Sequence, residues 1–254
     1  MFYLDEYTNP YEMIIDCINN ILVKEHHNFK FYAHNMSEFD GIIILKALMD
    51  LVNKHDFTFN VKSNKDGKII SLDIVKKFKS QKKIIKISIL DSFLLLPFSL
   101  NKLATVFNSE MTKGIFPYKF IKSDNINYIG TVPELQHFQD LSLEEYQKYC
   151  NLKFDKWDCK VETLNYLQKD LDILFEIMHK FNETIFKEFK VNISRIRTLS
   201  GLAFLIFSAN FYLCDFSKRN KCFLAKARVN LIPNPFTLQV VKLKNLLEKH
   251  IMEV

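Results

Sequence analysis

The spacing of hydrophobic and polar positions changes several times along the chain, which predicts an alternation of strands and helices. Aromatic and polar residues alternate in FYLDEY (residues 2–7) and in FKFYAH (residues 29–34), a period of two that is typical of strands. Between them, residues 11–24 carry apolar positions three to four apart, which indicates a helix. A further helix is expected over residues 39–52. The pattern therefore predicts a strand–helix–strand–helix unit.

The next segment has the pattern of an antiparallel hairpin. FTFNVKSNKDGKIISLDIVKKF (residues 57–78) alternates, turns at Asp66-Gly67 and alternates again, which is a strong short-range hairpin signal. KKIIKISILDSF (residues 82–93) is then expected to form another strand. Strands of both orientations are therefore predicted in one sheet.

The second half of the chain is expected to be mainly helical after a loop-rich stretch. A helix is predicted over residues 99–108, where the hydroxyl of Ser99 is suited to accept a backbone N–H as an N-cap. Glycines and prolines among aromatic residues predict loops over residues 109–149. Helical patterns follow over residues 161–189 and 200–212. The whole pattern predicts an α/β fold with a mixed sheet, followed by a mostly helical C-terminal segment.

Composition and charge narrow the class of protein only slightly. With 254 residues, 48% of them hydrophobic and 25% charged, the chain can bury a sizeable core and is not expected to be disordered. A net charge of +6 permits a polyanionic partner without requiring one. The five cysteines are an odd number without CxxC spacing, so they favour neither a zinc site nor a disulfide framework.

No segment has the pattern of a targeting peptide or a membrane span. The N-terminus lacks both a basic region followed by an apolar stretch and the Arg- and Ser-rich composition of a transit peptide. The apolar run at residues 88–100 is interrupted by Asp91 and Pro97 and is too short to cross a bilayer. We therefore expect a soluble protein that is not exported and has no membrane partner.

Two polar clusters carry candidate chemistry. In HNMSEFD (residues 34–40), Asp40 stands where a helix begins, and a carboxylate there is stabilised by the helix dipole or serves equally as a capping group. In YLQKD (residues 166–170), Tyr166 precedes Asp170 by four residues, so both project from one helix face. On spacing alone, this pair is more typical of a surface or half-buried contact than of a catalytic unit.

Together, the two clusters resemble the second and third exonuclease motifs of family B DNA polymerases. The resemblance is closest to the protein-primed organellar and viral branch, which includes the polymerases of mitochondrial linear plasmids. Other segments resemble the usual motifs of that branch in the same order, over about residues 2–211: YAHN…FDGI…LK, LDSFLLLPFSLNKLA, KGIFPY, YIGTVPE and TLSGLAF. The resemblance implies a ribonuclease H-like 3′–5′ exonuclease domain over residues 1–190. It also implies a helical segment over residues 191–254 that leads toward a palm domain.

The resemblance also implies roles for individual residues at a metal site. In this family, four carboxylates from three motifs hold two divalent metal ions, Mg²⁺ or Mn²⁺, which clamp the scissile phosphate and activate a water molecule. Asp40 and Asp170 match two of those ligands, and Tyr166 matches the residue that orients the water. Lys113 stands where the family often has a lysine facing the phosphate. A solvated surface lysine is the alternative for Lys113.

A groove for the single-stranded end of a primer is implied as well. Asn35 and Phe39 match positions that hold the primer end by hydrogen bonding and by stacking on a base. His34 and Tyr32 adjoin that groove. The implied partners are single-stranded DNA or a primer terminus, and a terminal protein primer is a further candidate.

Two parts of the family pattern are missing from the sequence. The first exonuclease motif, Asp-x-Glu on an earlier strand, has no counterpart, since the adjacent Asp5 and Glu6 would point to opposite faces of a strand. Polymerase motifs are also missing after TLSGLAF. We therefore expect a partial DNA-directed DNA polymerase with an incomplete metal site and defective catalysis, unless another chain supplies the remainder. The alternative is a non-catalytic remnant that binds single-stranded DNA.

Three further expectations follow. The missing motif belongs to a central strand in the family, so its absence predicts exposed strand edges and aggregation. A composition rich in Lys, Asn, Ile and Phe is consistent with an A+T-biased organellar genome, which favours a mitochondrial location over the cytoplasm. Several apolar positions are predicted to be core residues: Ile42, Ile44, Leu45, Leu94 and Leu95.

Overall fold

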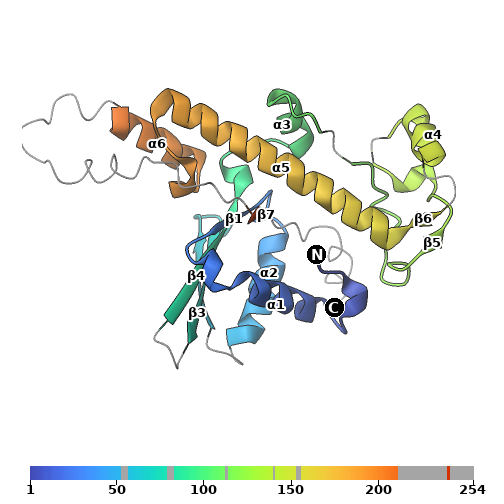
Figure 1. Ribbon diagram of the computed structural model, residues 1–254, viewed down its shortest axis with the longest axis horizontal. Coiled ribbons are helices and arrows are strands. Elements are labelled where there is room, and N and C mark those ends of the chain that lie inside the picture. The colour runs from blue at the N-terminus through green and yellow to red at the C-terminus, as the bar shows by residue number, and fades with distance from the viewer. Residues whose placement is uncertain are drawn as a thin grey trace, which may run out of the picture.

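A mixed five-stranded sheet with helices packed against it forms the centre of the computed structural model (Figure 1). The structure describes residues 1–52, 57–78, 83–111, 114–139, 141–152, 156–210 and 239–240. The sheet contains β1 (Lys30–Ala33), β2 (Phe57–Ser63), β3 (Ile69–Phe78), β4 (Lys83–Asp91) and β7 (Gln239–Val240). The helices are α1 (Pro10–Ile21), α2 (Asp40–Val52), α3 (Leu100–Val106), α4 (Leu143–Leu152), α5 (Cys159–Phe189) and α6 (Leu199–Asn210).

The strand order is β2-β3-β4-β1-β7, with β2, β3 and β4 antiparallel and β1 parallel to both of its neighbours. The predicted hairpin is confirmed, and its turn forms as the sequence indicates. Gly67 has a φ of 79°, a left-handed conformation that glycine adopts without strain. The side-chain oxygen of Asn64 accepts the backbone N–H groups of Asp66 and Lys68. The predicted α/β class with a mixed sheet is therefore confirmed.

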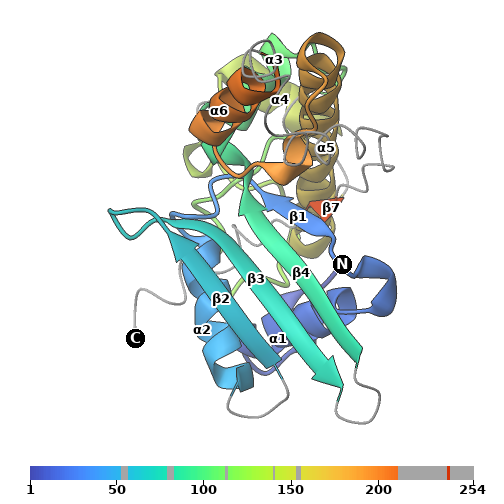
Figure 2. The same cartoon turned by 90° about the vertical axis from the view of Figure 1, so that its left-hand side faces the viewer.

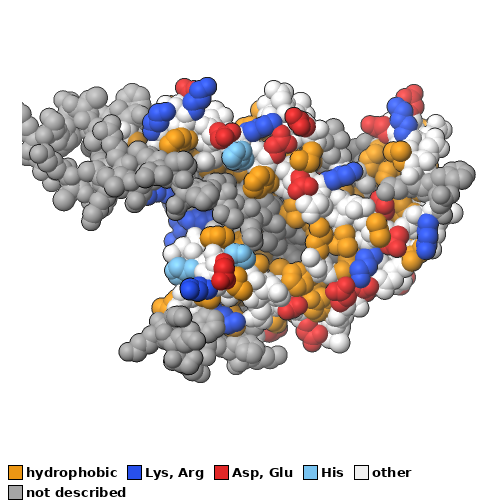
Figure 3. All heavy atoms as spheres, viewed as in Figure 1, with side chains coloured by type: hydrophobic (Ala, Val, Ile, Leu, Met, Phe, Trp, Pro, Cys, Tyr) orange, Lys and Arg blue, Asp and Glu red, His pale blue; other side chains and the backbone are white. Residues whose placement is uncertain are grey.

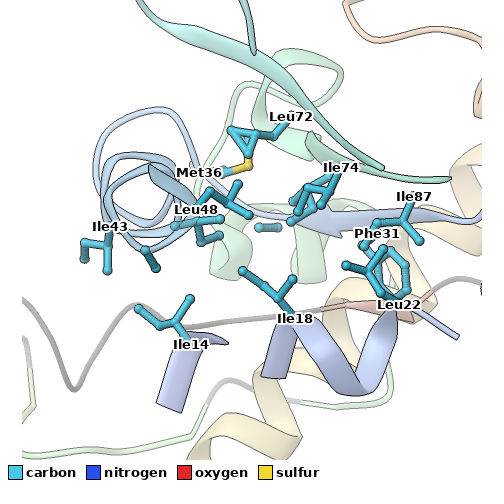
Figure 4. Packing of buried hydrophobic residues seen from close by; sticks show 14 of the residues in the cluster. Ile14, Ile18, Leu22, Phe31, Met36, Ile43, Leu48, Leu72, Ile74 and Ile87 are labelled. Atoms are coloured by element: carbon cyan, nitrogen blue, oxygen red, sulfur yellow. The ribbon is translucent and has the colours of Figure 1, made fainter. Parts of the chain in front are cut away.

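Alternation along the strands separates two faces of the sheet. One face is apolar and packs on α1 and α2, and Figure 4 shows Ile18 of α1 pointing toward the sheet that carries Ile74 of β3. The other face is covered at one end by α3, α5 and α6, where Tyr32 of β1 lies in a second core with Ile173. Apolar packing on both sides explains why Phe31, Tyr32 and Ala33 of β1 are all buried.

A third core lies beside the N-terminal end of α5, outside the main sheet. It is mainly aromatic and surrounds a short ladder of β5 (Ile129–Gly130) and β6 (Trp157–Asp158). Trp157 is fully buried, and its indole N–H donates to the Tyr149 hydroxyl at 3.0 Å. Aromatic packing therefore organises a region that has little regular backbone structure of its own.

The helix termini are largely explained by local capping. Asn9 accepts the N–H of Glu12 at the start of α1, and Pro10 occupies the first turn. The predicted cap at Ser99 is confirmed, because its hydroxyl accepts the N–H of Lys102. Asp158 caps α5 in the same way. The 3₁₀ turns η1 (Leu4–Glu6), η2 (Lys24–His26), η3 (Ser92–Leu94), η4 (Leu135–His137) and η5 (Ile193–Arg195) connect the larger elements.

Three sequence-based expectations are wrong in this structure. Residues 2–7 do not form a strand but contain η1, because Tyr3 is buried and donates its hydroxyl to the carbonyl of Ile126 at 2.6 Å. Loops were predicted over residues 109–149, but α4 begins at Leu143. Its sequence is largely polar and shows no clear helical spacing of apolar residues. Ile42 is 59% exposed on the outer side of α2, whereas Ile44 and Leu95 are buried as predicted.

The edge of β1 also differs from the expectation. A parallel pairing with β7 places Gln239 beside Phe31 and Val240 beside Tyr32, so this part of the β1 edge is covered. Aggregation stays a prediction. Except for β7, the fold expected after residue 210 lies outside the described residues, and the proposed domain division also stays a prediction. In the described part of the chain, no helix combines the length and apolar character that a bilayer crossing requires.

Candidate functional site

The loop between β1 and α2 is held in place by one buried carboxylate. Asp91 ends β4 and is completely buried. Its Oδ1 accepts the backbone N–H of Asn35 at 2.9 Å, and its Oδ2 accepts that of Ser37 at 2.9 Å. Oδ1 also accepts the N–H of Phe93 at the start of η3. Asp91 therefore joins two backbone segments, and it holds Asn35 with a φ of 62°, a conformation that asparagine tolerates better than most residues.

His34 makes a second connection between the same two segments. Its Nε2 lies 2.9 Å from the carbonyl oxygen of Phe98, to which it donates, and its Nδ1 lies 3.0 Å from Ser92 Oγ. The imidazole also contacts the edge of the Phe93 ring. His34 thus has a positioning role in this structure, and its proposed contact with DNA stays a prediction.

The loop ends on an exposed aromatic residue followed directly by a buried carboxylate. Phe39 is 45% exposed, whereas Asp40, the first residue of α2, is 2% exposed. The N–H of Gly41 donates to the carbonyl of Met36 at 2.8 Å, which fixes the chain direction at this point. An aromatic surface is therefore held next to a carboxylate at a helix N-terminus, where negative charge is favoured.

The two candidate residues of α5 are also buried, and they lie on the same side of the helix. Tyr166 is 3% exposed and Asp170 is 1% exposed. Tyr166 stacks on Phe116 with ring centroids 5.0 Å apart, and its hydroxyl accepts a hydrogen bond from that of Tyr118. Burial, with a smaller contribution from Tyr118, raises the pKa of Tyr166 above its usual range. The phenol is therefore neutral at physiological pH.

Gly114 allows the GIFPY segment (residues 114–118) to approach Tyr166. A Cβ atom at residue 114 would lie 2.8 Å from Cδ2 of Tyr166, which is closer than real side chains come. Gly114, Phe116 and Tyr118 therefore form one packing surface for Tyr166. This role was not predicted from the sequence, although the Gly-x-Phe-x-Tyr alternation was a possible signal. Lys113, which precedes this segment, lies outside the described residues.

Tyr32 connects β1 to the part of α5 that follows Asp170. It is 1% exposed and belongs to the same core as Ile173 and Leu174, which lie about one helical turn beyond Asp170. Desolvation raises the pKa of Tyr32 above its usual range. The structure places Tyr32 in this core, and its suggested role in DNA binding stays a prediction.

The described residues offer only part of what a metal centre requires. Asp40 and Asp170 offer carboxylate oxygens, the ligands that Mg²⁺ and Mn²⁺ prefer. Within the described ranges, however, no group of three or more His, Cys, Asp or Glu residues is placed to hold a metal ion. Two carboxylates alone do not match the donor set of a two-metal site, so we derive no step through a metal ion.

The comparison with protein families identifies the class to which this chain belongs. Residues 22–247 match the family described as DNA polymerase type B, organellar and viral. Because the match covers most of the chain, the protein belongs to this family. The family inferred from the sequence motifs is therefore confirmed.

Individual relatives agree with this assignment. A probable DNA polymerase of Ascobolus immersus is 36% identical over 207 residues, which cover 79% of this chain and 17% of the relative. One of Neurospora intermedia is 31% identical over 210 residues, covering 80% of this chain and 21% of the relative. The chain thus spans about a fifth of the length of these relatives.

Among solved structures, the chain is similar to Phi29 DNA polymerase complexed with single-stranded DNA. The two are 19% identical with a TM-score of 0.47, and the matched region covers 76% of this chain and 28% of that one.

Proposed function

We propose that this chain is the 3′–5′ exonuclease-like part of a family B DNA polymerase and that it holds the single-stranded 3′ end of a primer at the loop before α2. The observation that carries this proposal is the exposed ring of Phe39 beside the buried carboxylate of Asp40. Asp91 and His34 anchor the loop through hydrogen bonds, so little conformational entropy would be lost when a base stacks on Phe39. Asn35 would add a hydrogen bond to the bound strand.

The catalytic part of the proposal is narrower. Asp40 and Asp170 would be the residues of this chain that hold Mg²⁺ or Mn²⁺, and the bound ions would supply an activated water molecule. That chemistry requires carboxylates in addition to these two. We therefore propose that the chain alone binds a primer end without trimming it. We also propose that Tyr166 orients the water molecule and that Lys113 faces the phosphate, as the resemblance implies. A terminal protein partner and a mitochondrial location are proposed on the same ground.

A second candidate function is a non-catalytic role in binding single-stranded DNA. The same observation supports it, because stacking on Phe39 does not depend on a metal ion. The two functions differ in one property: the first requires that the carboxylates become active when the remaining parts of a polymerase are present. A trimming assay with and without those parts separates them.

Binding at Phe39 is tested by the fluorescence anisotropy of a labelled single-stranded oligonucleotide. Stacking of one base on an aromatic side chain contributes about 1–3 kcal/mol, so Phe39→Ala should weaken binding about tenfold or more. Phe175 on α5 is a matched control, because its exposure of 43% is close to the 45% of Phe39. Phe175→Ala should leave the affinity within about twofold. Equal affinities of Phe39→Ala and the unchanged protein would contradict the proposal.

A further inference from the structure

The sheet carries a second surface of distinct chemistry, on the side turned away from α1 and α2. We call it the outer face. Figure 2 looks onto it, and no described helix lies in front of the lower parts of β2, β3 and β4. Strand register places one row of side chains across this face: Asn60, Asp73, Ser88 and Lys30. Neighbouring strands are about 4.8 Å apart, so these side chains are close neighbours.

Basic residues outnumber acidic ones on the outer face. Lys62, Lys77 and Lys86 lie on it because each is an even number of positions from Asn60, Asp73 or Ser88 along its strand. Arg195 and Arg197, from η5 and the segment after it, approach Lys30 closely enough to influence its titration. Figure 3 shows Lys and Arg side chains gathered between α6 and the sheet. Burial is the main cause that lowers the pKa of Lys30, and the positive charge of Arg197 lowers it further. The second effect is repulsion between the two cations.

Asp73, the acidic residue that faces this cluster, is already bound by Ser88 and Lys86. Asp73 is 5% exposed, accepts the hydroxyl of Ser88 at 2.6 Å and lies 3.3 Å from Lys86 Nζ. Burial opposes ionisation of Asp73, but the hydrogen bonds from Ser88 and Lys86 outweigh it and lower its pKa. Among the described residues, Lys30, Lys62, Lys77, Arg195 and Arg197 form no ion pair. The outer face therefore keeps an excess of positive charge.

The outer face offers charge without exposed aromatic rings. Its side chains on β2 and β3 are polar, basic or aliphatic, and Tyr32 of β1 is buried. A surface of this kind contacts phosphates and does not stack on bases. Duplex DNA presents one negative charge per about 1.7 Å of its axis, which is a higher charge density than that of a single strand.

We propose that the outer face binds the phosphate backbone of duplex DNA, at a site separate from the loop that holds a primer end. Phosphate contacts position DNA without reading its sequence, so binding here is independent of sequence and strongly dependent on salt. The partner follows from the charge complementarity and from the polymerase family to which the chain belongs. Single-stranded DNA binds this face more weakly than a duplex of the same length.

The test is a titration of the full chain with a blunt-ended labelled duplex at several salt concentrations, because a blunt duplex offers no single-stranded end to Phe39. The test variant combines Lys62→Gln, Lys77→Gln and Arg195→Gln, three exposed residues outside the Asp73 ion pair. The control variant removes the same charge elsewhere, with Lys122→Gln, Lys148→Gln and Lys187→Gln. Thermal melting of both variants should match that of the unchanged protein.

The proposal makes a quantitative distinction. Loss of three phosphate contacts should weaken duplex binding more than about tenfold at 0.1 M salt and reduce the slope of log affinity against log salt by about 2.7. The control variant should stay within about threefold. The proposal is overturned if the two variants lose affinity equally, if the unchanged chain does not bind the duplex, or if a single strand competes better than the duplex.

Discussion

The loop before α2 and the surroundings of Tyr166 position candidate residues by different means. The loop is held by charge-assisted hydrogen bonds to one carboxylate, and its terminal ring, Phe39, remains exposed. Tyr166 is held by aromatic packing against Phe116 and Tyr118, and it is buried. The loop before α2 therefore presents an exposed ring that a ligand can contact, whereas the surroundings of Tyr166 form a buried, tightly packed support.

The largest expected effect comes from removing the carboxylate that holds the loop. Asp91→Ala leaves the N–H groups of Asn35, Ser37 and Phe93 without their acceptor, and each lost partner of a buried group costs about 1–3 kcal/mol. We expect the free energy of unfolding to fall by about 4 kcal/mol in urea denaturation. Asp172→Ala on α5, which removes only an exposed side-chain hydrogen bond with Gln168, is the control and should cost about 0.5 kcal/mol or less. A loss below about 1 kcal/mol for Asp91→Ala would show that the loop is held in another way.

A smaller loss is expected in the aromatic region from one added methyl group. Gly114→Ala places Cβ against the ring of Tyr166 and forces the packed segment apart, which typically costs about 1–3 kcal/mol. Gly201→Ala in α6 is the milder comparison: its Cβ atom would lie 3.2 and 3.3 Å from side-chain atoms of Thr198 and Ile196, so smaller shifts relieve the contact, and alanine favours the helix. Equal thermal stability of Gly114→Ala and the unchanged protein would mean that this segment packs less rigidly than the structure indicates.

The smallest stability effect is expected from removing one hydroxyl. Tyr118→Phe keeps the ring contacts of Tyr118 but removes the hydrogen bond to Tyr166, which is worth about 1 kcal/mol. Affinity for single-stranded DNA should not change, since Phe39 belongs to the other region. A loss of DNA affinity without a loss of stability would contradict this separation, and anisotropy together with urea denaturation measures both quantities.

Local signals explain most of what the sequence predicted correctly. The hairpin depends on Asp66-Gly67 and on alternation within one segment, and the start of α3 depends on the hydroxyl of Ser99. Both features arise from residues close in sequence. The family motifs added the candidate roles of Asp40 and Asp170, which helical periodicity alone left open.

Non-local contacts explain what the sequence did not predict. The role of Asp91 depends on backbone groups more than fifty positions earlier in the chain. The pairing of β7 with β1 joins segments about two hundred residues apart, and neither segment carries a signal for the other. Tyr3 was assigned to a strand because of aromatic alternation, but its side chain is buried and its hydroxyl bonds to the carbonyl of Ile126 and lies 3.9 Å from Sγ of Cys159. Periodicity reports the local backbone and cannot identify distant partners.

The central claim is that this chain holds a primer end but does not by itself complete the chemistry. The most direct test is degradation of a 3′-labelled single-stranded oligonucleotide by the purified chain with Mg²⁺ or Mn²⁺, beside the double variant Asp40→Ala, Asp170→Ala. We predict binding that Phe39→Ala weakens, and no shortening of the oligonucleotide with either metal ion. Metal-dependent shortening that the double variant loses would contradict the claim, because further carboxylates of this chain would then complete the metal site.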